Sequence, residues 1–210
     1  MEREKIPGFD RYKSIAAPSS GIYKDNGSRF LAFACPVESE EQAKERISRL
    51  KREYFDARHH CYAYRIGYDG AVWRANDDGE PSSTAGRPIY GQILSNGLSD
   101  IIIVVVRYFG GIKLGVPGLI KAYKSSSADA IANASIIEKV AKKTFIVRFG
   151  YAQMNEMMQL LKQMQITAEK REFGLECNVE IKIPLSEAGR FTKAIEKIEG
   201  TKLSDICQKV

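Results

Sequence analysis

The sequence predicts an α+β protein of two domains, and three observations support this class. The 210 residues exceed the length of an average single domain. Hydrophobic residues make up 44% of the chain and charged residues 28%, which is enough apolar material for a packed core. Finally, the alternation of strand-like and helix-like patterns begins again after Glu138. We therefore expect one domain at residues 1–140 and a second at residues 141–210.

The composition also narrows the class of protein. No apolar run approaches the roughly 18–20 residues that a membrane-spanning helix needs, and the longest, Ile101–Val106, fits a buried strand. The N-terminus lacks the apolar segment of a secretory signal. The four cysteines are scattered without a Cys-x-x-Cys pair, which argues against a zinc site or a disulfide scaffold. These features predict a cytoplasmic protein without membrane contact, metal or other cofactor.

The net charge of +6 is spread evenly along the chain. Residues 1–140 carry 20 Lys and Arg against 17 Asp and Glu, and the remainder carries 12 against 9. Because no basic tail or block exists, the charge permits a nucleic-acid partner without requiring one. A basic but merely solvated surface explains the same numbers.

The first elements are a hairpin and a helix. Gly21–Lys24 and Ser28–Val37 read as strands joined by Asp25-Asn26-Gly27, since Asn-Gly tolerates positive φ in tight turns. Ser39, with Gln42 three residues later, forms a capping-box pattern that predicts a helix start. Apolar residues at helical spacing continue that helix: Ala43, Ile47, Leu50 and Tyr54.

A second hairpin and a buried strand follow. Cys61–Ile66 and Ala71–Ala75 read as strands, and a polar loop then leads to a short helix over Ile89–Leu94. The run Ile101–Val106 does not alternate, so we expect a strand that is buried on both faces. This strand enters a glycine-rich stretch, and a helix is expected to begin near Pro117, a residue suited to the first turn.

The second domain is also predicted to combine strands and helices, in an order of its own. A strand at Thr144–Phe149 precedes a methionine-rich helix, and Ile166–Glu172 and Cys177–Ile183 form a hairpin about Phe173-Gly174. A helix at Ser186–Ile198 and a short strand near Leu203 complete the order βαββαβ. This order is that of a ferredoxin-like domain.

The glycine-rich stretch is the first candidate site, for phosphate or nucleic acid. A buried strand that leads through glycines into a helix start presents backbone N–H groups and the positive end of the helix dipole. Gly110, Gly111 and Gly115 would let the backbone approach an anion, and Arg107 and Lys113 would add charge. The stretch matches neither a Walker A loop nor Gly-x-Gly-x-x-Gly. The alternative is that the glycines only form a tight turn.

The acidic loop is the second candidate site. Asp77, Asp78 and Glu80 are side chains that could bind a cation or act as a base. Turns and helix caps use the same residue types, and we favour that explanation here. His59 and His60 point to opposite faces of a strand, so a shared metal is not expected. His59 and Glu80 remain the candidates for a catalytic residue.

Several aromatic residues on the predicted strands have two explanations. Tyr62, Tyr64, Trp73 and Tyr108 could stack on nucleobases. Aromatic residues of adjoining strands more often belong to the core.

Two long segments together resemble the IMPACT/YigZ family. They are Asp77-Asp78-Gly79-Glu80-Pro81-Ser82-Ser83-Thr84-Ala85-Gly86 and Arg107-Tyr108-Phe109-Gly110-Gly111-Ile112-Lys113-Leu114-Gly115. The strand Ala57–Tyr64 is similar to the histidine-bearing strand of the family, with His59 at the family position. Gly27–Phe30 resembles its early strand. The chain departs from the usual pattern at Val116-Pro117, where Thr-Gly is common, and at Ser83, where Gly is common.

The resemblance implies a fold and a cleft. The N-terminal domain should be a two-layer α/β domain like the second domain of a small-subunit ribosomal protein. The later region is similar to the accessory domain of bacterial members, which resembles the last domain of elongation factor G. Both family segments should line one cleft, with His59, Asp78, Glu80 and Thr84 in its wall. Eukaryotic members regulate a translation-control kinase through protein contacts.

Our leading functional hypothesis is a non-enzymatic regulator or binding module in translation, which engages RNA, the ribosome or a protein partner through this cleft. The alternative is an enzyme that acts on a phosphorylated or peptide substrate, with His59 or Glu80 as the base. An exposed apolar patch in place of a basic groove would favour a protein-interaction adaptor.

Overall fold

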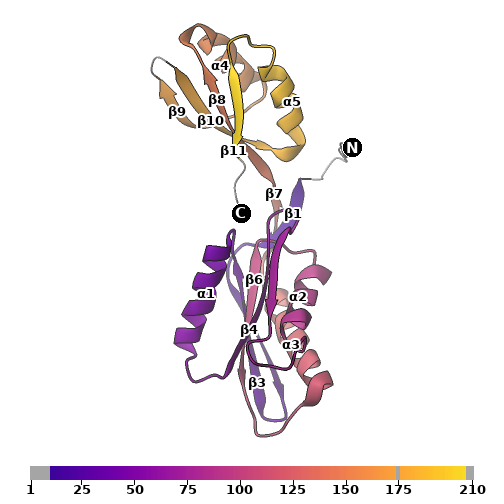
Figure 1. The fold of residues 1–210 in the computed structure, drawn as a ribbon. Coiled ribbons are helices and arrows are strands. Elements are labelled where there is room, and N and C mark those ends of the chain that lie inside the picture. Colours follow the sequence, from indigo (N-terminus) through magenta and orange to yellow (C-terminus); the bar gives the residue numbers. More distant parts are fainter. Residues whose placement is uncertain (1–9, 174–175, 207–210) are drawn as a thin grey trace. The chain divides into compact units, whose positions relative to one another are not determined.

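The computed structural model describes residues 10–173 and 176–206, which divide into two compact units (Figure 1). The N-terminal unit is Tyr12–Lys139. The C-terminal unit joins the described residues from Val140 onward to Asp10 and Arg11. Both units combine helices with antiparallel sheets, so the predicted α+β class is confirmed.

A five-stranded antiparallel sheet forms the centre of the N-terminal unit. Its strands, in spatial order, are β2 (Ser19–Asp25), β3 (Ser28–Pro36), β6 (Ile101–Tyr108), β4 (His59–Ile66) and β5 (Val72–Asn76). The central strand β6 is fully buried from Ile101 to Val106, as its unbroken apolar sequence predicted. Asn26 and Gly27 both have positive φ in the β2–β3 turn, which confirms the predicted hairpin.

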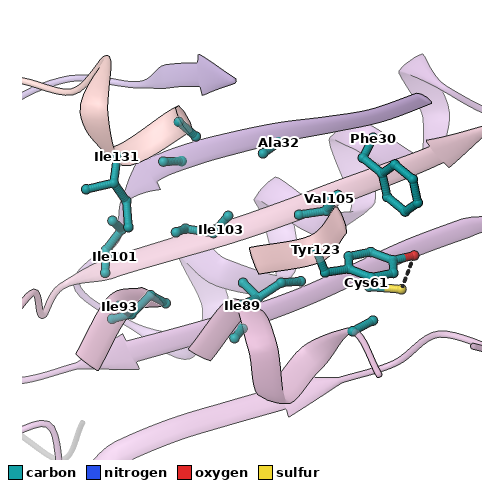
Figure 2. Close-up of a cluster of buried hydrophobic side chains, with 14 of the residues drawn as sticks. Phe30, Ala32, Cys61, Ile89, Ile93, Ile101, Ile103, Val105, Tyr123 and Ile131 are labelled. Carbon is teal, nitrogen blue, oxygen red and sulfur yellow. Dashed lines mark hydrogen bonds between the residues drawn. The ribbon is translucent and has the colours of Figure 1, made fainter. Parts of the chain in front are cut away.

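Helices pack on both faces of this sheet (Figure 1). On one face, α2 (Gly86–Ser95) and α3 (Gly115–Ala132) cover the main core. Figure 2 shows Ile89 and Ile93 of α2 and Tyr123 of α3 pointing toward the strands of this core. On the opposite face, α1 (Glu40–Glu53) packs against the alternate residues of β4 and β6. The predicted cap is present, since Ser39 Oγ accepts a hydrogen bond from Gln42 N at 3.3 Å.

The C-terminal end of α3 closes one edge of the sheet. The outer strand β2 donates Ile22 N to Asp129 Oδ2 at 2.8 Å, and Asn133 Nδ2 donates to Ser20 O at 2.9 Å. The helix can approach this closely because Gly21 has no side chain, since a Cβ there would lie 2.2 Å from Ala130 N. The strand β5 forms the other edge.

A small second sheet, which we did not predict from the sequence, pairs β1 (Arg11–Ile15) with β7 (Ile136–Val140). The buried carboxylate of Asp100 anchors both of its strands. Tyr12 Oη donates to Asp100 Oδ2 at 2.6 Å, and Lys139 Nζ lies 3.3 Å from the same oxygen. Burial opposes the charged ammonium, but Glu38 and Asp100 together hold the pKa of Lys139 above its usual value.

The C-terminal unit has the predicted order βαββαβ. Its elements are β8 (Lys142–Phe149), the short 3-10 helix η1 (Tyr151–Gln153), α4 (Met154–Gln163), β9 (Ala168–Phe173), β10 (Cys177–Pro184), α5 (Leu185–Ile195) and β11 (Lys202–Ile206). The sheet order is β11-β8-β10-β9. Met157 of α4 and Phe191 of α5 are fully buried against this sheet, so the methionine-rich helix packs into the core. Gly174 of the expected hairpin turn lies outside the described residues.

Candidate functional site

The acidic loop is organised by Asp77, which caps helix α2. Its Oδ1 accepts hydrogen bonds from Ala85 N at 3.0 Å and Gly86 N at 2.8 Å, and its Oδ2 accepts from Ser83 N at 2.9 Å. Ala85, at the N-cap position, cannot supply such a cap itself. The cap from Asp77 explains why α2 begins at Gly86, ahead of the predicted start.

Asp78 joins the loop to β4 and α1. Its Oδ2 accepts a hydrogen bond from His60 N at 2.7 Å, and its Oδ1 lies 3.0 Å from Lys51 Nζ. Although burial opposes ionisation, the His60 N–H group and the Lys51 ammonium hold the pKa of Asp78 below its usual value. The backbone of Asp78 has positive φ, as have those of Gly79 and Ser83. Hydrogen bonds within the loop and contacts with β4 and α1 therefore fix its conformation.

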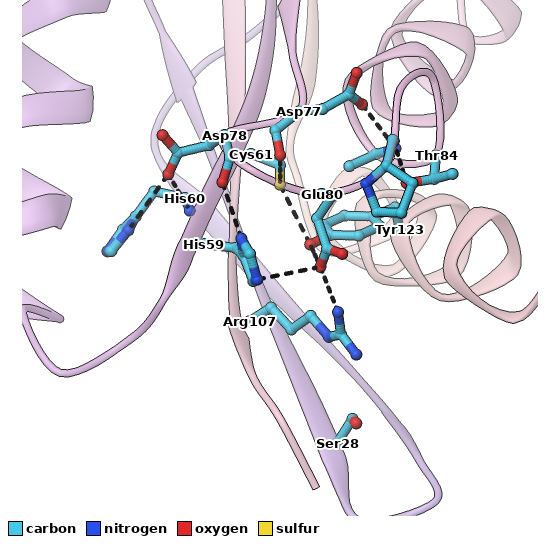
Figure 3. Close-up of polar contacts among 12 residues, drawn as sticks. Ser28, His59, His60, Cys61, Asp77, Asp78, Glu80, Thr84, Arg107 and Tyr123 are labelled. Carbon is cyan, nitrogen blue, oxygen red and sulfur yellow. Dashed lines mark hydrogen bonds and ion pairs between the residues drawn. The ribbon is translucent and has the colours of Figure 1, made fainter. Parts of the chain in front are cut away.

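At the centre of the site, Glu80 and Arg107 form a buried ion pair (Figure 3). Arg107 Nη1 lies 2.5 Å from Glu80 Oε1, and the side chains are only 8% and 3% exposed. Tyr123 Oη of α3 donates to the same carboxylate oxygen at 2.8 Å. Arg107 Nε is buried and has no hydrogen-bond partner among the described residues. The guanidinium also lies over the Phe30 and Phe109 rings, 5.4 and 5.7 Å from their centroids.

His59 lies beside this ion pair. Its Nδ1 lies 2.9 Å from the carbonyl oxygen of Asp78, and a carbonyl can only accept, so Nδ1 must carry the proton. In the neutral ring Nε2 is then an acceptor, and it lies 4.0 Å from Glu80 Oε1. The structure thus brings together three predicted residues, His59, Glu80 and Arg107, through the β4–β6 register that sets His59 opposite Arg107.

Cys61 and Tyr123 complete the cluster, although no sequence pattern predicts either of them at the site. Cys61 Sγ donates to Asp77 O at 2.9 Å and lies 3.2 Å from Tyr123 Oη. Burial raises the pKa of the Cys61 thiol, so the sulfur stays protonated and is a poor nucleophile. Burial likewise raises the pKa of the Tyr123 phenol. No local pattern distinguishes Tyr123 from the other residues of its apolar helical stripe.

Thr84 lies in the same loop and is also buried. Its Oγ1 donates to Pro81 O at 2.7 Å, which stabilises the turn before α2. Among the residues that the structure describes, no three His, Cys, Asp or Glu side chains come close enough to hold a metal ion.

The glycines of the β6–α3 loop have different roles. Gly110 packs against the β2–β3 turn, where a Cβ would lie 2.0 Å from the Gly27 carbonyl carbon, and its N–H donates to Ser28 Oγ at 3.1 Å. Gly111 and Gly115 have positive φ, which other residues rarely adopt. Lys113 is exposed between them. The binding of phosphate by this loop stays a prediction, and its expected charge donor Arg107 is paired with Glu80.

The same loop and the first two turns of α3 expose large apolar side chains. The exposed fractions are 52% for Phe109, 58% for Ile112, 52% for Val116 and 38% for Ile120. We call these four residues, which run from the end of β6 onto the second turn of α3, the β6–α3 apolar surface. No helix among the described residues is both long and apolar enough to cross a membrane.

Comparison with known proteins identifies the family. Residues 26–131, which include both segments singled out above, match the Impact N-terminal domain. IMPACT family member YvyE of Bacillus subtilis is 32% identical over 179 residues, which cover 85% of this chain and 82% of that protein. IMPACT family member YigZ of Escherichia coli is 32% identical over 182 residues, which cover 84% of this chain and 88% of that protein.

A solved structure extends the similarity to both units. The crystal structure of a hypothetical protein is 29% identical, with a TM-score of 0.73, and the match covers 95% of this chain and 99% of that one. The resemblance inferred from the loop segments and from the strand that carries His59 is confirmed by these matches. The chain belongs to the IMPACT family.

Proposed function

We propose that this protein is a translation-associated binding module that docks an acidic, amphipathic segment of a partner protein on its β6–α3 apolar surface. The translation role rests on the family, whose eukaryotic members regulate a translation-control kinase. The observation that carries the docking proposal is the exposure of Phe109, Ile112 and Val116, each more than half exposed, on the β6–α3 loop and the first turn of α3.

Exposed apolar groups that lie together in the sequence call for a partner. Single exposed apolar residues are ordinary on protein surfaces, whereas groups of them mark interaction sites. Val116 and Ile120 are four residues apart on α3 and therefore share one face of the helix. Phe109 and Ile112 precede this helix in the chain by a few residues, and both are more than half exposed.

The charge around this surface favours an acidic partner. No Asp or Glu occurs from Ile101 to Ala128, while Lys113, Lys121 and Lys124 are exposed in this segment. Lys124 follows Ile120 by four residues, so the basic and apolar side chains share a stripe of α3. An acidic segment with an apolar face would satisfy both properties.

The buried cluster fits a supporting role in this proposal. Arg107 is neutralised by Glu80, and its guanidinium lies against the Phe109 ring, so the ion pair positions the base of the loop. The enzyme alternative would need a substrate to reach Glu80, whose side chain is 3% exposed. A phosphate ligand would likewise have to compete with Glu80 for Arg107.

Site-specific photocrosslinking tests the proposal. A photoreactive phenylalanine analogue at Ile112 should give a covalent adduct with a protein of the translation machinery in cells, which mass spectrometry would identify. The matched control places the same analogue at Tyr151, which is 78% exposed in the C-terminal unit. Adducts with RNA alone, or the same adducts from both positions, would overturn the proposal.

A second variant checks the charge argument. Lys113→Glu combined with Lys121→Glu should abolish the Ile112 adduct in a protein that still folds, because both side chains are exposed and their replacement leaves the core intact. An undiminished adduct would show that the partner does not carry complementary acidic groups.

A further inference from the structure

Two aromatic rings form a partly exposed stack at the β5 edge of the N-terminal sheet. Trp73 of the edge strand β5 lies on Tyr90 of α2, with the ring centroids 4.7 Å apart and the planes at 19°. Trp73 is nevertheless 46% exposed. Tyr90 lies against one face of the indole, so a further planar group would stack on the opposite face.

A stripe of α2 extends this stack. Arg87, Tyr90 and Leu94 are spaced three and four residues apart, so they lie on one face of the helix. Leu94 is 48% exposed. Arg87 is also exposed, and its guanidinium makes no hydrogen bond or ion pair with any residue in the described part of the chain.

Gly91 has no packing role on this stripe. A Cβ at this position would meet no atom within 4 Å. Glycine inside a helix is unfavourable relative to alanine, and elsewhere in the unit, as at Gly21 and Gly110, the glycines allow close packing. Gly91 follows Arg87 by four residues, so the missing side chain leaves open space on the face of α2 that carries Arg87.

The charge of this surface suits an anionic ligand. No Asp or Glu occurs from Pro81 to Ser99, and Arg87 is the charged residue of that segment. On the face of the sheet that carries Trp73, the neighbouring Arg65 adds a second cation, although its guanidinium donates to Leu98 O and Asp69 O. A flat aromatic face beside unpaired positive charge is the arrangement that binds single-stranded nucleic acid by stacking on the bases.

We propose that Trp73 and Tyr90 form a stacking platform for an unpaired base of single-stranded RNA, with Arg87 contacting an adjacent phosphate. The choice of RNA over DNA rests on the proposed translation role. The platform itself lies on β5 and α2 and uses none of the residues of the β6–α3 apolar surface. The two proposals therefore fail independently.

The chain reports on this site directly, because Trp73 is its one tryptophan. A base that stacks on the indole should quench its fluorescence, so titration of the full chain with a short oligouridylate measures binding at the platform. An oligomer of the same length without bases should bind at least about fivefold more weakly, because stacking on an aromatic ring contributes about 1–3 kcal/mol per base. An oligodeoxythymidylate of the same length tests the choice of RNA.

Gly91 provides a matched pair of variants that keep the reporter. Gly91→Glu places a carboxylate one helical turn from Arg87, where it would compete with phosphate for the guanidinium, and should weaken oligouridylate binding about threefold to fivefold. Gly91→Ala, which fits the open space, should leave the affinity unchanged. Arg87→Gln should reduce the salt dependence of binding.

The proposal would be overturned by no quenching at low salt, by equal affinity for the oligomer without bases, by equal loss of affinity in the two Gly91 variants, or by tighter binding of DNA than of RNA. Quenching by an acidic peptide in place of RNA would assign the platform to a protein partner and would also overturn it. None of these results bears on the Ile112 adduct, so the docking proposal would stand or fall separately.

Discussion

Removal of one partner of the Glu80–Arg107 ion pair should destabilise the N-terminal unit by about 3–5 kcal/mol. The estimate follows from the burial of the pair, since the side chains are only 3% and 8% exposed. Arg107→Met would leave the Glu80 carboxylate with Tyr123 as its remaining donor in the cluster. Glu80→Gln would leave a buried guanidinium whose Nε already lacks a partner among the described residues.

The double variant separates the ion pair from simple loss of packing. Glu80→Gln combined with Arg107→Met removes both charges and still offers Tyr123 an acceptor. Because replacing both members of a buried pair is often nearly neutral, we expect the double variant to recover about 2 kcal/mol or more relative to the sum of the single variants. A surface ion pair would show coupling of about 1 kcal/mol or less.

Urea denaturation monitored by Trp73 fluorescence is the appropriate assay. The one tryptophan of the chain lies in the same unit as the ion pair, so its signal follows the unfolding of that unit. The single variants should also lower the melting temperature by about 10–15 °C. Losses below about 1 kcal/mol for both single variants, or additive losses in the double variant, would refute the reasoning.

Three further predictions concern the surroundings of the site. Asp77→Ala should destabilise the unit by about 1–2 kcal/mol in the same urea assay, because it removes the cap of α2, and an unchanged midpoint would contradict this. Burial holds the pKa of His60 below its ordinary 6.5, so the unfolded chain binds a proton first on acidification. The free energy of unfolding should thus fall as pH drops through 6.5, and His60→Gln should lack this slope. Gly110→Ala should lower stability by about 1–3 kcal/mol through overlap with the β2–β3 turn, whereas Gly91→Ala should raise it by about 0.5–1 kcal/mol. Equal effects of these two substitutions would show that the close approach at Gly110 does not hold.

Sequence patterns correctly predicted those elements whose structure depends on residues that are close together in the chain. The unbroken apolar run Ile101–Val106 specified a strand buried on both faces, and Asn26-Gly27 specified a turn with positive φ. The capping box at Ser39 likewise located the start of α1. In each case the decisive residues lie within a few positions of one another, so the sequence alone is sufficient.

Contacts between distant segments could not be predicted in the same way. Glu80 and Arg107 were both singled out, but 27 residues separate them, and the pairing of β4 with β6 brings their surroundings together. The strands β1 and β7 have only five residues each, which is too short for a recognisable pattern. They also come from opposite ends of the segment that forms the N-terminal unit, so no local signal links them. The start of α2 also depends on Asp77, which caps the helix from across a loop.

The side chains of Asp129 and Asn133 give the N-terminal sheet two unlike edges. They occupy an N–H and a carbonyl group of β2, which a neighbouring strand would otherwise use. Fibril growth needs an open edge on both sides of every added copy. Two copies could meet through their β5 edges, but such a pair would present at either end a β2 edge on which Asp129 and Asn133 already occupy two backbone groups. Light scattering of concentrated protein should accordingly find no species larger than a dimer. A third copy would have to pair with a β2 edge whose backbone groups are already partly occupied.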